Sequence, residues 1–542
     1  MYGVTKNLKY IFVVGGVMSG VGKGVAAAAI GKILQARGLN VTAVKIDPYV
    51  NVDAGTMNPT EHGEVFVLDD GMECDQDMGN YERFLGVNLT GRNYMTTGSV
   101  YLSVINRERS LGYGGKCVEV VPHIPLEVID RINKAATKDK ANAVIVEIGG
   151  TVGEYQNILF LEAIRMLKTK KPQDVVLVLV SYLPIRGKDN ELKTKPTQYA
   201  VRTLNSAGLQ PDIVIARAEV PLDKKRKQKI AYNCGLEEKD IISAPDVTSI
   251  YDIPITFEKE KIGDQLFNKL NLRPKKKDLH DFKNLARTVR SLKEPVSIGI
   301  VGKYFGTGDF ILADSYISVL EAIKHAAYAL KRKPVIEWVD SEELGNLDRY
   351  DGIIIPGGFG SRGIEGKLTA INFARRKKIP FFGLCYGMQL AIVEFSRSVA
   401  RLKGADSTEI DAKTPHPVID ILPEQKKNLS ESNYGATMRL GAWPAVLKDK
   451  TIARTAYGKE IISERHRHRY EVNPEYIQIL EAKGLIFSGI SPNRRLMEIM
   501  ELPKKEHPFF VGTQFHPEFK SWPLSPHPLF KAFIKASISS RK

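Results

Sequence analysis

Short apolar runs alternate with helix-forming stretches through the first half of the chain, and this order restricts the fold more than any other feature. The apolar runs are "YIFVVGG" (10–16), "NVTAVKI" (40–46), "NAVIVEIGG" (142–150), "DVVLVLV" (174–180) and "DIVIAR" (212–217). Helical stretches over Lys23–Arg37 and about Gln156–Leu167 lie between them. Such β-α-β order predicts a mostly parallel sheet with helices on both faces and ligands at the carboxyl ends of its strands.

A second run of the same kind begins at "VSIGIVGKY" (296–304) and continues through "DGIIIPGG" and "IPFFGLCYGMQLAIVEF". The stretch before it, 272–295, is polar and strongly charged, which indicates a linker that contains a helix. A chain of 542 residues is too long for one hydrophobic core. We therefore expect two doubly wound α/β domains with mostly parallel sheets, over 1–271 and 296–542.

Composition excludes several classes of function. No apolar run is long enough to span a membrane, and the polar start of the chain leaves no room for a secretory signal, so we expect a cytoplasmic protein. The four cysteines form no C-x-x-C pair, which argues against a disulfide framework or a zinc site. The net charge of +16 is spread along the chain without a nucleic-acid-binding motif, so clusters such as "KKRKQK" (224–229) are interpreted as solvated faces.

The stretch "GGVMSGVGKG" (15–24) nearly fits a phosphate-binding loop. In the usual pattern, G-x-x-x-x-G-K-[ST], glycine amides cradle phosphates, the lysine neutralises them and the last hydroxyl helps to hold magnesium. Gly22 and Lys23 match, but Val17 occupies the first glycine position and Gly24 replaces the hydroxyl. If a nucleoside triphosphate binds here, carboxylates from elsewhere must hold its Mg²⁺.

Two carboxylates are candidates for this metal. Glu147 closes the apolar run "NAVIVEIGG" and so belongs to the ligand-binding edge of the sheet, and Asp77 lies in "CDQDMGNYERF" with Asp75 as a weaker alternative. A core ion pair for Glu147 and a helix cap for Asp77 are the structural alternatives.

In "KTKPTQ" (193–198), two lysines precede a proline suited to the first turn of a helix, which is typical of a polyphosphate site but also of a solvated lysine pair.

In the second half, Cys385 lies between an apolar strand and a helix. Gly383 and Gly387 flank it at the spacing of a nucleophile elbow, and a helix N-terminus favours the thiolate form. In "GTQFHPEF", His516 could shuttle the proton and Glu518 could orient the imidazole from two residues further along a strand. Glycine amides of "PGGFG" (356–360), with the amide after Cys385, could form an oxyanion hole. The alternative is a buried small cysteine and a surface histidine.

These residues resemble the class I, triad-type glutamine amidotransferases. The resemblance implies that glutamine is hydrolysed through a thioester on Cys385 and that ammonia is released. It also implies a set of glutamine-binding positions, namely Gly358, Tyr386, Gly387, Met388, Gln389, Glu409 and Arg469. Tyr386 departs from the leucine that is more usual there, which puts the shape of the glutamine pocket in doubt.

Longer blocks extend the resemblance over nearly the whole chain. The blocks "KIDPYVNVDAGTMNPTEHGEVFVLDDG", "GNYERFL", "IGGTVGE", "KTKPTQ", "GGFGSRGIEGK" and "ERHRHRYEVN" look like those of the CTP synthase family. Membership implies a dethiobiotin-synthetase-like P-loop domain fused to the glutaminase. In that scheme ATP phosphorylates O4 of UTP, and ammonia then displaces phosphate at C4 to give CTP.

The same resemblance assigns roles to individual residues. ATP would contact Ser19, Gly20, Val21, Gly22, Lys23, Gly24, Val25, Lys45, Asp77 and Asp246, and Mg²⁺ would be held by Asp77 and Glu147. UTP or CTP would contact Ser19, Glu154, Tyr155, Gln156, Lys193, Thr194, Lys195, Pro196, Thr197, Gln198 and Lys229. For Lys229, this overrules the interpretation of its cluster as a solvated face.

Regulation and assembly are also implied by the family. GTP would bind near Arg362, Gly363 and Glu365 and activate the enzyme. His62 resembles a residue that lines the ammonia path, and the alternative is a packed turn histidine. Members of the family are homotetramers, and some form filaments. The family usually reads G-D-I-E-S where this chain has Gly153 to Asn157, "GEYQN". Because these acidic positions recognise inhibitory CTP, we expect altered feedback inhibition.

Two other interpretations keep the same fold class. An ATP-dependent amidase, such as cobyrinic acid diamide synthase, joins similar domains but would need neither "KTKPTQ" nor the "KIDPYVN" block. A filament scaffold with an inactive amidotransferase would need neither Lys23 nor the set of Cys385, His516 and Glu518.

Overall fold

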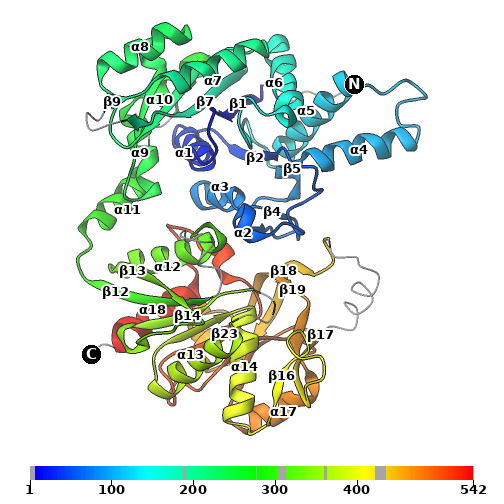
Figure 1. The fold of residues 1–542 in the computed structure, drawn as a ribbon, viewed down its shortest axis with the longest axis vertical. Coiled ribbons are helices and arrows are strands. Elements are labelled where there is room, and N and C mark those ends of the chain that lie inside the picture. Colours follow the sequence, from blue (N-terminus) through cyan, green and yellow to red (C-terminus); the bar gives the residue numbers. More distant parts are fainter. Residues whose placement is uncertain are drawn as a thin grey trace. The chain divides into compact units, whose positions relative to one another are not determined.

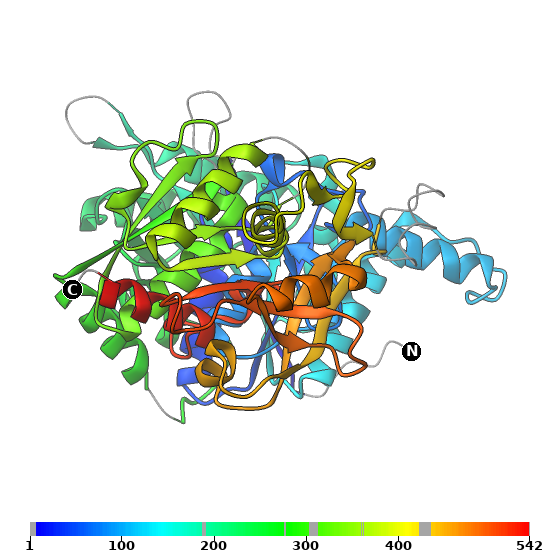
Figure 2. The ribbon, with the colours of Figure 1, turned by 90° about the horizontal axis from the view of Figure 1, so that it is seen from below.

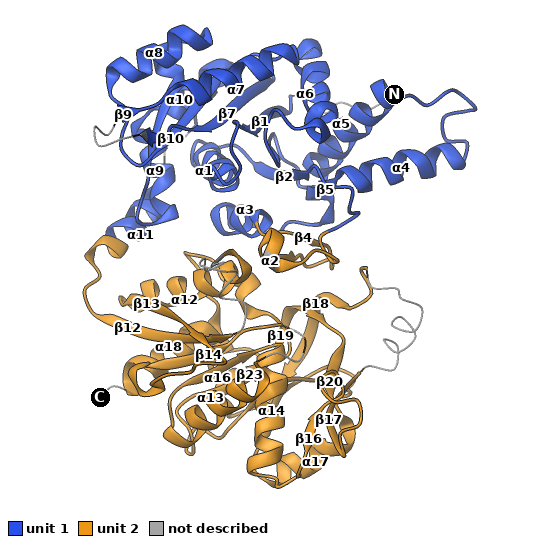
Figure 3. Cartoon of the chain, viewed as in Figure 1, with its two compact units in different colours: residues 1–53, 77–287 blue, residues 54–76, 288–542 orange. Residues whose placement is uncertain are grey.

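The computed structural model describes residues 7–186, 191–275, 278–302, 313–358, 360, 363–421 and 435–540. They form two compact units, residues 1–53 with 77–287 (unit 1) and residues 54–76 with 288–542 (unit 2) (Figure 3). Unit 2 thus includes a segment, 54–76, that the expected domain boundaries place in the first domain. No helix in the described part of the chain is long and apolar enough to cross a lipid bilayer.

Unit 1 is built on a sheet of seven strands whose neighbours all run parallel (Figure 1). In spatial order these are β11 (Ile241–Pro245), β10 (Ile213–Ala218), β7 (Val175–Tyr182), β1 (Lys9–Gly15), β6 (Ala143–Ile148), β2 (Val41–Asp47) and β5 (Tyr94–Thr96). The expected parallel α/β fold is therefore confirmed for this unit.

The helices of unit 1 connect these strands. They are α1 (Lys23–Ala36), α3 (Asp77–Leu85), α4 (Thr97–Arg109), α5 (Val120–Lys138), α6 (Ile158–Lys170), α7 (Lys195–Ser206), α8 (Lys224–Cys234), α9 (Ile253–Lys259) and α10 (Ile262–Lys269). The expected linker, 272–295, contains α11 (His280–Ser291), in which Phe282 packs against Phe84 and Tyr251 of unit 1. The predicted helix is present, and its first turns belong to unit 1.

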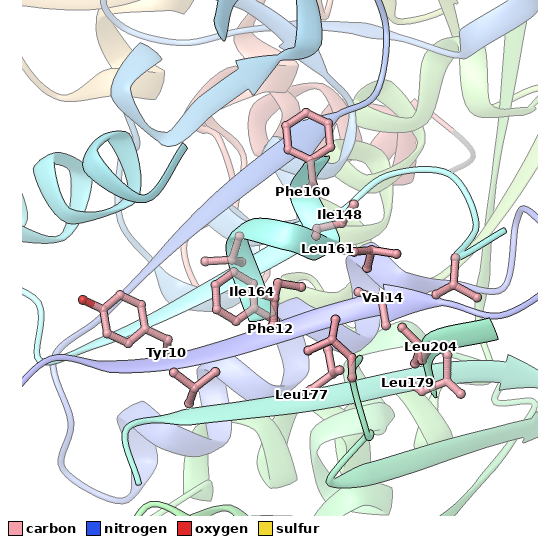
Figure 4. Close-up of a cluster of buried hydrophobic side chains, with 14 of the residues drawn as sticks. Tyr10, Phe12, Val14, Ile148, Phe160, Leu161, Ile164, Leu177, Leu179 and Leu204 are labelled. Carbon is pink, nitrogen blue, oxygen red and sulfur yellow. The ribbon is translucent and has the colours of Figure 1, made fainter. Parts of the chain in front are cut away.

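Strands β1, β6 and β7 form the centre of unit 1 and are buried on both faces. On one face Tyr10, Phe12 and Val14 of β1 pack with side chains of β6, β7, α6 and α7 (Figure 4). The intervening residues of β1, Ile11 and Val13, are also fully buried. Full burial of such a side chain contributes about 1.5–3 kcal/mol to the stability of the fold. Because both faces of these strands are buried, their sequences are continuously apolar and lack the alternation with polar residues that half-exposed strands show.

Unit 2 contains a sheet of nine strands that is mixed rather than mostly parallel. Its parallel part is β13 (Lys333–Asp340), β12 (Pro295–Gly302), β14 (Gly352–Ile355), β15 (Phe381–Leu384) and β23 (Phe510–Thr513). Antiparallel pairing then adds β22 (Met497–Glu501), β21 (Ile486–Ile490), β18 (Arg439–Leu447) and β19 (Ile461–His468). The α/β class is confirmed, with this difference in strand direction.

Helices cover both faces of the larger sheet of unit 2, with α13 (Ile364–Lys377) and α14 (Tyr386–Ser398) on one face and α12 (Ile317–Ala329) and α18 (Pro528–Ser540) on the other (Figure 2). Two further helices are α16 (Ile452–Tyr457) and α17 (Pro474–Ala482). Smaller sheets consist of β16 (Ala405–Ser407), β17 (His416–Ile421) and β20 (Tyr470–Val472), and of β3 (Val65–Val67) with β4 (Glu73–Asp75). Helix α2 (Pro59–His62) and the β3–β4 hairpin make up most of the segment 54–76.

Candidate functional site

Cys385 occupies the sharp turn between β15 and α14, with φ of 49° and ψ of −100°. A non-glycine residue keeps such a backbone only where its surroundings enforce it. A Cβ on Gly383 would lie 2.6 Å from the carbonyl oxygen of Gly387, and a Cβ on Gly387 would lie 2.1 Å from that of Ile355. Both glycines are therefore required by close backbone packing, as the G-x-C-x-G spacing predicts.

His516 and Glu518 lie beside this turn. Nδ1 of His516 is 2.7 Å from Oε1 of Glu518, and both side chains and Cys385 are buried. Residues 517–520 form a short 3₁₀ helix, so the expectation that one strand would carry both side chains on the same side is wrong, although their contact forms. Burial opposes protonation of the imidazole, but attraction to Glu518 and Cys385 raises the pKa of His516 to about 10.

The thiol of Cys385 has two further contacts in unit 2. Nε2 of Gln514 donates to its Sγ at 3.6 Å, and Sγ donates to the backbone carbonyl of Arg467 at 3.8 Å. Gly357, in the glycine loop after β14, fits closely against the His516 ring, since a Cβ there would lie 2.8 Å from Cε1. The nucleophile, the base and the glycine loop thus meet at the carboxyl ends of β14, β15 and β23.

A cavity of about 760 Å³ within unit 2 opens at Cys385. Four of the predicted glutamine-binding residues line it, namely Gly358, Gln389, Glu409 and Arg469. Residues 55–59, from the segment 54–76, line the same cavity and were not predicted to do so. The cavity therefore combines the sequence-predicted residues with a wall supplied by a distant part of the chain.

The other three predicted positions, Tyr386, Gly387 and Met388, do not line the cavity. The Tyr386 hydroxyl donates to the carbonyl of Gly360 at 2.7 Å, and Met388 is fully buried in the core of unit 2. Gly387 has no side chain, so these three residues could serve glutamine only through main-chain groups. The tyrosine in place of the usual leucine is thus accommodated by the glycine loop, outside the lining of the cavity.

The predicted activator residues lie apart from that cavity. Gly363 and Glu365, at the start of α13, line a different cavity of about 660 Å³, while Arg362 lies outside the described residues. His62 ends α2 in the segment 54–76, and its side chain is exposed, so it is not a packed turn residue.

In unit 1 the loop 15–24 connects β1 to α1, as a phosphate-binding loop should. Gly20 and Gly22 take left-handed conformations, and Ser19 is exposed on the loop. Nζ of Lys23 lies over Gly15 and donates to the carbonyl of Gly150 at 2.8 Å. Burial lowers the pKa of Lys23, partly offset by attraction to nearby carboxylates. The lysine is held at the carboxyl ends of β1 and β6.

Asp77 and Glu147 converge on one point beside this loop. Nζ of Lys45 lies 2.6 Å from Oδ2 of Asp77 and 3.0 Å from Oε1 of Glu147, and the Tyr81 hydroxyl donates to the other oxygen of Glu147. The parallel register makes Lys45 of β2 the direct neighbour of Glu147 of β6. Burial raises the pKa of Glu147, whereas for Asp77 burial is outweighed by Lys45, which lowers its pKa. Asp75 lies on β4 and belongs to unit 2.

The glycine at the loop's hydroxyl position is explained by Asp77. A Cβ on Gly24 would lie 1.8 Å from Oδ1 of Asp77, so the carboxylate fills the space that a serine or threonine would need. Two carboxylates beside a phosphate-binding loop suit Mg²⁺, which takes its remaining ligands from phosphate and water. Among the described residues no group of three or more His, Cys, Asp or Glu side chains is arranged as a metal cage.

Arg217 is a site residue that the sequence analysis missed. It lies near the carboxyl end of β10, where Nη2 is 2.5 Å from Oδ1 of Asp246 and Nη1 donates to the carbonyl of Val21 at 3.4 Å. It thereby links the loop 15–24 to Asp246, the residue predicted to contact adenosine. The signal was present, because "DIVIAR" closes an apolar strand with a charge in the same way as "NAVIVEIGG".

The residues predicted for the pyrimidine nucleotide form two groups. Glu154 folds back, accepting the amide of Thr151 at 2.8 Å, and the Gln156 side-chain amide donates to it at 3.2 Å, while Tyr155 is exposed. In the second group, Thr194, Lys195, Pro196, Thr197 and Gln198 begin α7, preceded by Lys193. Contact with Lys193, with further attraction from Arg226 and Lys229 of α8, lowers the pKa of Glu191. Lys193, Arg226 and Lys229 thus all lie within electrostatic reach of Glu191 and form a positive cluster in which Lys193 pairs with Glu191 and Arg226 with Asp223; Arg226 was not predicted.

Comparison with known proteins gives consistent matches for both parts of the chain. Residues 9–272 match the family described as CTP synthase N-terminus, and residues 311–536 match glutamine amidotransferase class-I. CTP synthases of Caldanaerobacter subterraneus subsp. tengcongensis and Methanothermobacter thermautotrophicus are each 48% identical to this chain, over 538 and 535 residues, and cover 98% of both chains. The solved structure of the glutaminase domain of Trypanosoma brucei CTPS with bound acivicin is 38% identical to this chain. The match covers 45% of this chain and 94% of the solved domain, with a TM-score of 0.41.

The packing of Gly24 against Asp77 gives a direct prediction. Gly24→Ser should displace the Asp77 carboxylate and weaken binding of Mg²⁺·ATP by about 10- to 100-fold, the usual effect of disturbing a metal site. Isothermal titration calorimetry measures this affinity. Gly153→Ser is the matched control, because a Cβ on Gly153 would meet no other atom within 4 Å. Equal affinities of the two variants would contradict the proposed role of Asp77.

Proposed function

Since the chain belongs to the CTP synthase family, and so converts UTP to CTP with nitrogen from glutamine, we propose that its two units divide this reaction. Unit 2 would release ammonia from glutamine, and unit 1 would add it to UTP. One observation carries the proposal: each unit has its reactive groups gathered at the carboxyl edge of its own parallel strands, Lys23 with Asp77 and Glu147 in unit 1, and Cys385 with His516 and Glu518 in unit 2.

In unit 2, Sγ of Cys385 attacks the carboxamide carbon of glutamine while His516 holds the thiol proton. The raised pKa of His516 suits this role, and Glu518 fixes the ring through Nδ1. His516 then passes the proton to the departing nitrogen, ammonia leaves and a thioester remains. Water, activated by His516, hydrolyses the thioester to glutamate. The amides of Gly358 and Tyr386 would stabilise the oxyanion.

Glutamine itself is held in the 760 Å³ cavity. Glu409 and Arg469 bring opposite charges to its wall, which suits the ammonium and carboxylate groups of a free amino acid. Oε1 of Glu409 also accepts the amide of Gly360 at 3.0 Å, so the same carboxylate fixes the glycine loop. These contacts support the assignment of this cavity as the glutamine site.

In unit 1, the carbonyl oxygen O4 of UTP is a poor leaving group until it is phosphorylated. The γ-phosphoryl group of ATP moves to O4, ammonia attacks C4, and phosphate leaves with O4, so that UTP, ATP and ammonia give CTP, ADP and phosphate. Lys23 neutralises the transferring phosphoryl group, with Lys45 beside it. Asp77 and Glu147 would hold Mg²⁺, which supplies charge stabilisation to the phosphates when bound.

The positive cluster on unit 1 fits the triphosphate of UTP. Lys193, Lys195 and Lys229, joined by Arg226, bring several cations to the start of α7, where free helix amides add to the attraction for phosphate.

We propose that GTP, bound near Arg362, Gly363 and Glu365, acts as an activator. CTP is proposed as an inhibitor that uses the Glu154–Gln156 stretch.

We propose that the chain self-associates into a homotetramer and that the tetramers can form filaments. The supporting observation is a set of exposed apolar side chains on and beside α4, namely Leu102, Ile105, Leu111, Val120 and Val121. A monomer rarely exposes such a group together. Sedimentation of the purified chain should give the mass of a tetramer, and a monomer at all concentrations would contradict this assembly.

The central prediction concerns Cys385→Ala. This variant should lose CTP formation from glutamine with GTP present, because no other group forms the thioester, yet keep CTP formation from ammonium chloride with ATP and Mg²⁺. CTP formation in the two assays is the measurement. Loss of both reactions would contradict the division between the units, and absence of CTP from the unchanged protein with either nitrogen source would contradict the acceptor assignment.

A second prediction concerns feedback inhibition. In this chain the Gln156 amide donates to the Glu154 carboxylate, and Gln156→Glu would replace this contact by repulsion between two carboxylates. Glu154 should then turn away from the Thr151 amide, and the inhibition constant for CTP should change. An unchanged inhibition constant, measured against UTP, would remove the stretch from the inhibitor site.

A further inference from the structure

The segment 54–76 belongs to unit 2 (Figure 3), where polar and apolar contacts hold it. Glu64 accepts hydrogen bonds from the amide and the hydroxyl of Ser318 at the start of α12. Phe66 packs on Phe519, with ring centroids 4.9 Å apart. The segment also supplies residues 55–59 to the wall of the Cys385 cavity. It is therefore a structural part of the glutamine site.

Strand β19 contacts this segment on one side and the catalytic residues through its backbone. Residues two apart in a strand share a face, and Arg465 and Arg467 both direct their side chains to the β3–β4 hairpin. Nε of Arg465 is 2.5 Å from Oδ1 of Asp69, and Nε of Arg467 is 2.8 Å from Oε1 of Glu73. The carbonyl of Arg465 accepts the amide of His516 at 2.8 Å, and that of Arg467 accepts the Cys385 thiol.

Of the two ion pairs, that of Glu73 is the more deeply buried. Its side chain is 1% exposed and that of Arg467 12%, whereas Asp69 is 31% exposed and has a second cation, Lys520, at 3.3 Å. In the described part of the chain, Oε2 of Glu73 has no hydrogen-bond partner. A buried carboxylate with one unpaired oxygen depends strongly on its single cation, so the position of Arg467 and that of Glu73 fix one another.

Arg467 is also tied to the same segment by a second contact, since Nη2 donates to the carbonyl of Gly55 at 3.3 Å. Both partners of its guanidinium thus come from residues 54–76, while its own carbonyl contacts the thiol that begins the reaction. We propose that Glu73 is a positioning residue for glutamine hydrolysis. By holding Arg467, it keeps the Arg467 carbonyl against Sγ of Cys385 and the guanidinium at the cavity wall.

This inference rests on the proposed role of Cys385 and predicts a particular pattern of effects. Glu73 does not line the cavity, so its loss should lower kcat for glutamine hydrolysis more than it changes KM. A small misplacement near a reacting atom can cost about 100-fold in rate. The phosphoryl-transfer groups belong to unit 1, so ammonium-driven CTP formation should be retained.

The test is Glu73→Gln, which removes the charge at constant size. We expect kcat for glutamate release to fall at least about tenfold and ammonium-driven CTP formation to stay within about twofold of the unchanged protein. The rate of Cys385 alkylation by iodoacetamide, followed on its peptide by mass spectrometry, should change as well, because the thiol loses a fixed acceptor. A merely structural role would not alter this rate in a protein that stays folded by circular dichroism.

Glu394→Gln is the matched control. Glu394 is a buried glutamate paired with Arg375 at 2.7 and 2.8 Å between α13 and α14, away from the thiol. Its variant should keep the alkylation rate and the kcat for glutamate release. If Glu73→Gln fails to fold, Glu73→Asp, which withdraws the carboxylate but keeps its charge, should show the same separation of the two nitrogen sources.

The inference would be overturned if Glu73→Gln matched Glu394→Gln in both alkylation rate and kcat, or if it lost the ammonium-driven reaction as well. Failure of the proposed function gives a different result. In that case Cys385→Ala would still make CTP from glutamine, whatever Glu73→Gln does.

Discussion

Both sites depend on one constraint: a parallel strand that helices cover on both faces is apolar along its middle, so its charged groups lie near its ends, and ligands bind at the carboxyl ends. In unit 1 the register places Lys45 beside Glu147, and the two side chains meet there with Asp77 and the loop that carries Lys23. In unit 2 the same edge holds Cys385 after β15 and His516 beyond β23. Lys45 with Asp77 and Glu147, and His516 with Glu518, lie at hydrogen-bond distance from opposite charges, which offsets the cost of their burial, whereas Lys23 donates to the carbonyl of Gly150.

Two departures from common motifs have local physical reasons. Gly24 replaces the usual hydroxyl because the Asp77 carboxylate fills that space, and we propose that this carboxylate takes over the metal-binding role of the hydroxyl. Tyr386 replaces the usual leucine because its hydroxyl binds the carbonyl of Gly360 in the glycine loop. In both cases the altered residue is explained by a partner that a motif pattern does not include.

The sequence predicted what depends on short-range order. The strand-loop-helix at Lys23, the turn at Cys385 and the charge that closes β6 were all legible from spacing and apolar runs. The pairing of Glu73 with Arg467 joins residues 394 positions apart, so no local pattern could indicate it, and the same holds for the place of segment 54–76 in unit 2. Arg217 was within reach of the argument used for Glu147. The antiparallel half of the second sheet was missed because β19 and β22 mix charged with apolar residues and so lack the continuous apolar runs of the parallel strands.

In the proposed mechanism, transfer of the phosphoryl group from ATP to O4 of UTP is the step that the carboxylates and lysines of unit 1 serve. UTP labelled with ¹⁸O at O4 tests it directly, with ATP, Mg²⁺ and ammonium chloride as the other reactants. The account predicts that the label leaves C4 with the phosphoryl group and appears in inorganic phosphate, one atom for each CTP formed. Labelled oxygen recovered in water, with unlabelled phosphate, would contradict phosphorylation of O4 and the assignment of Lys23, Asp77 and Glu147 to that step.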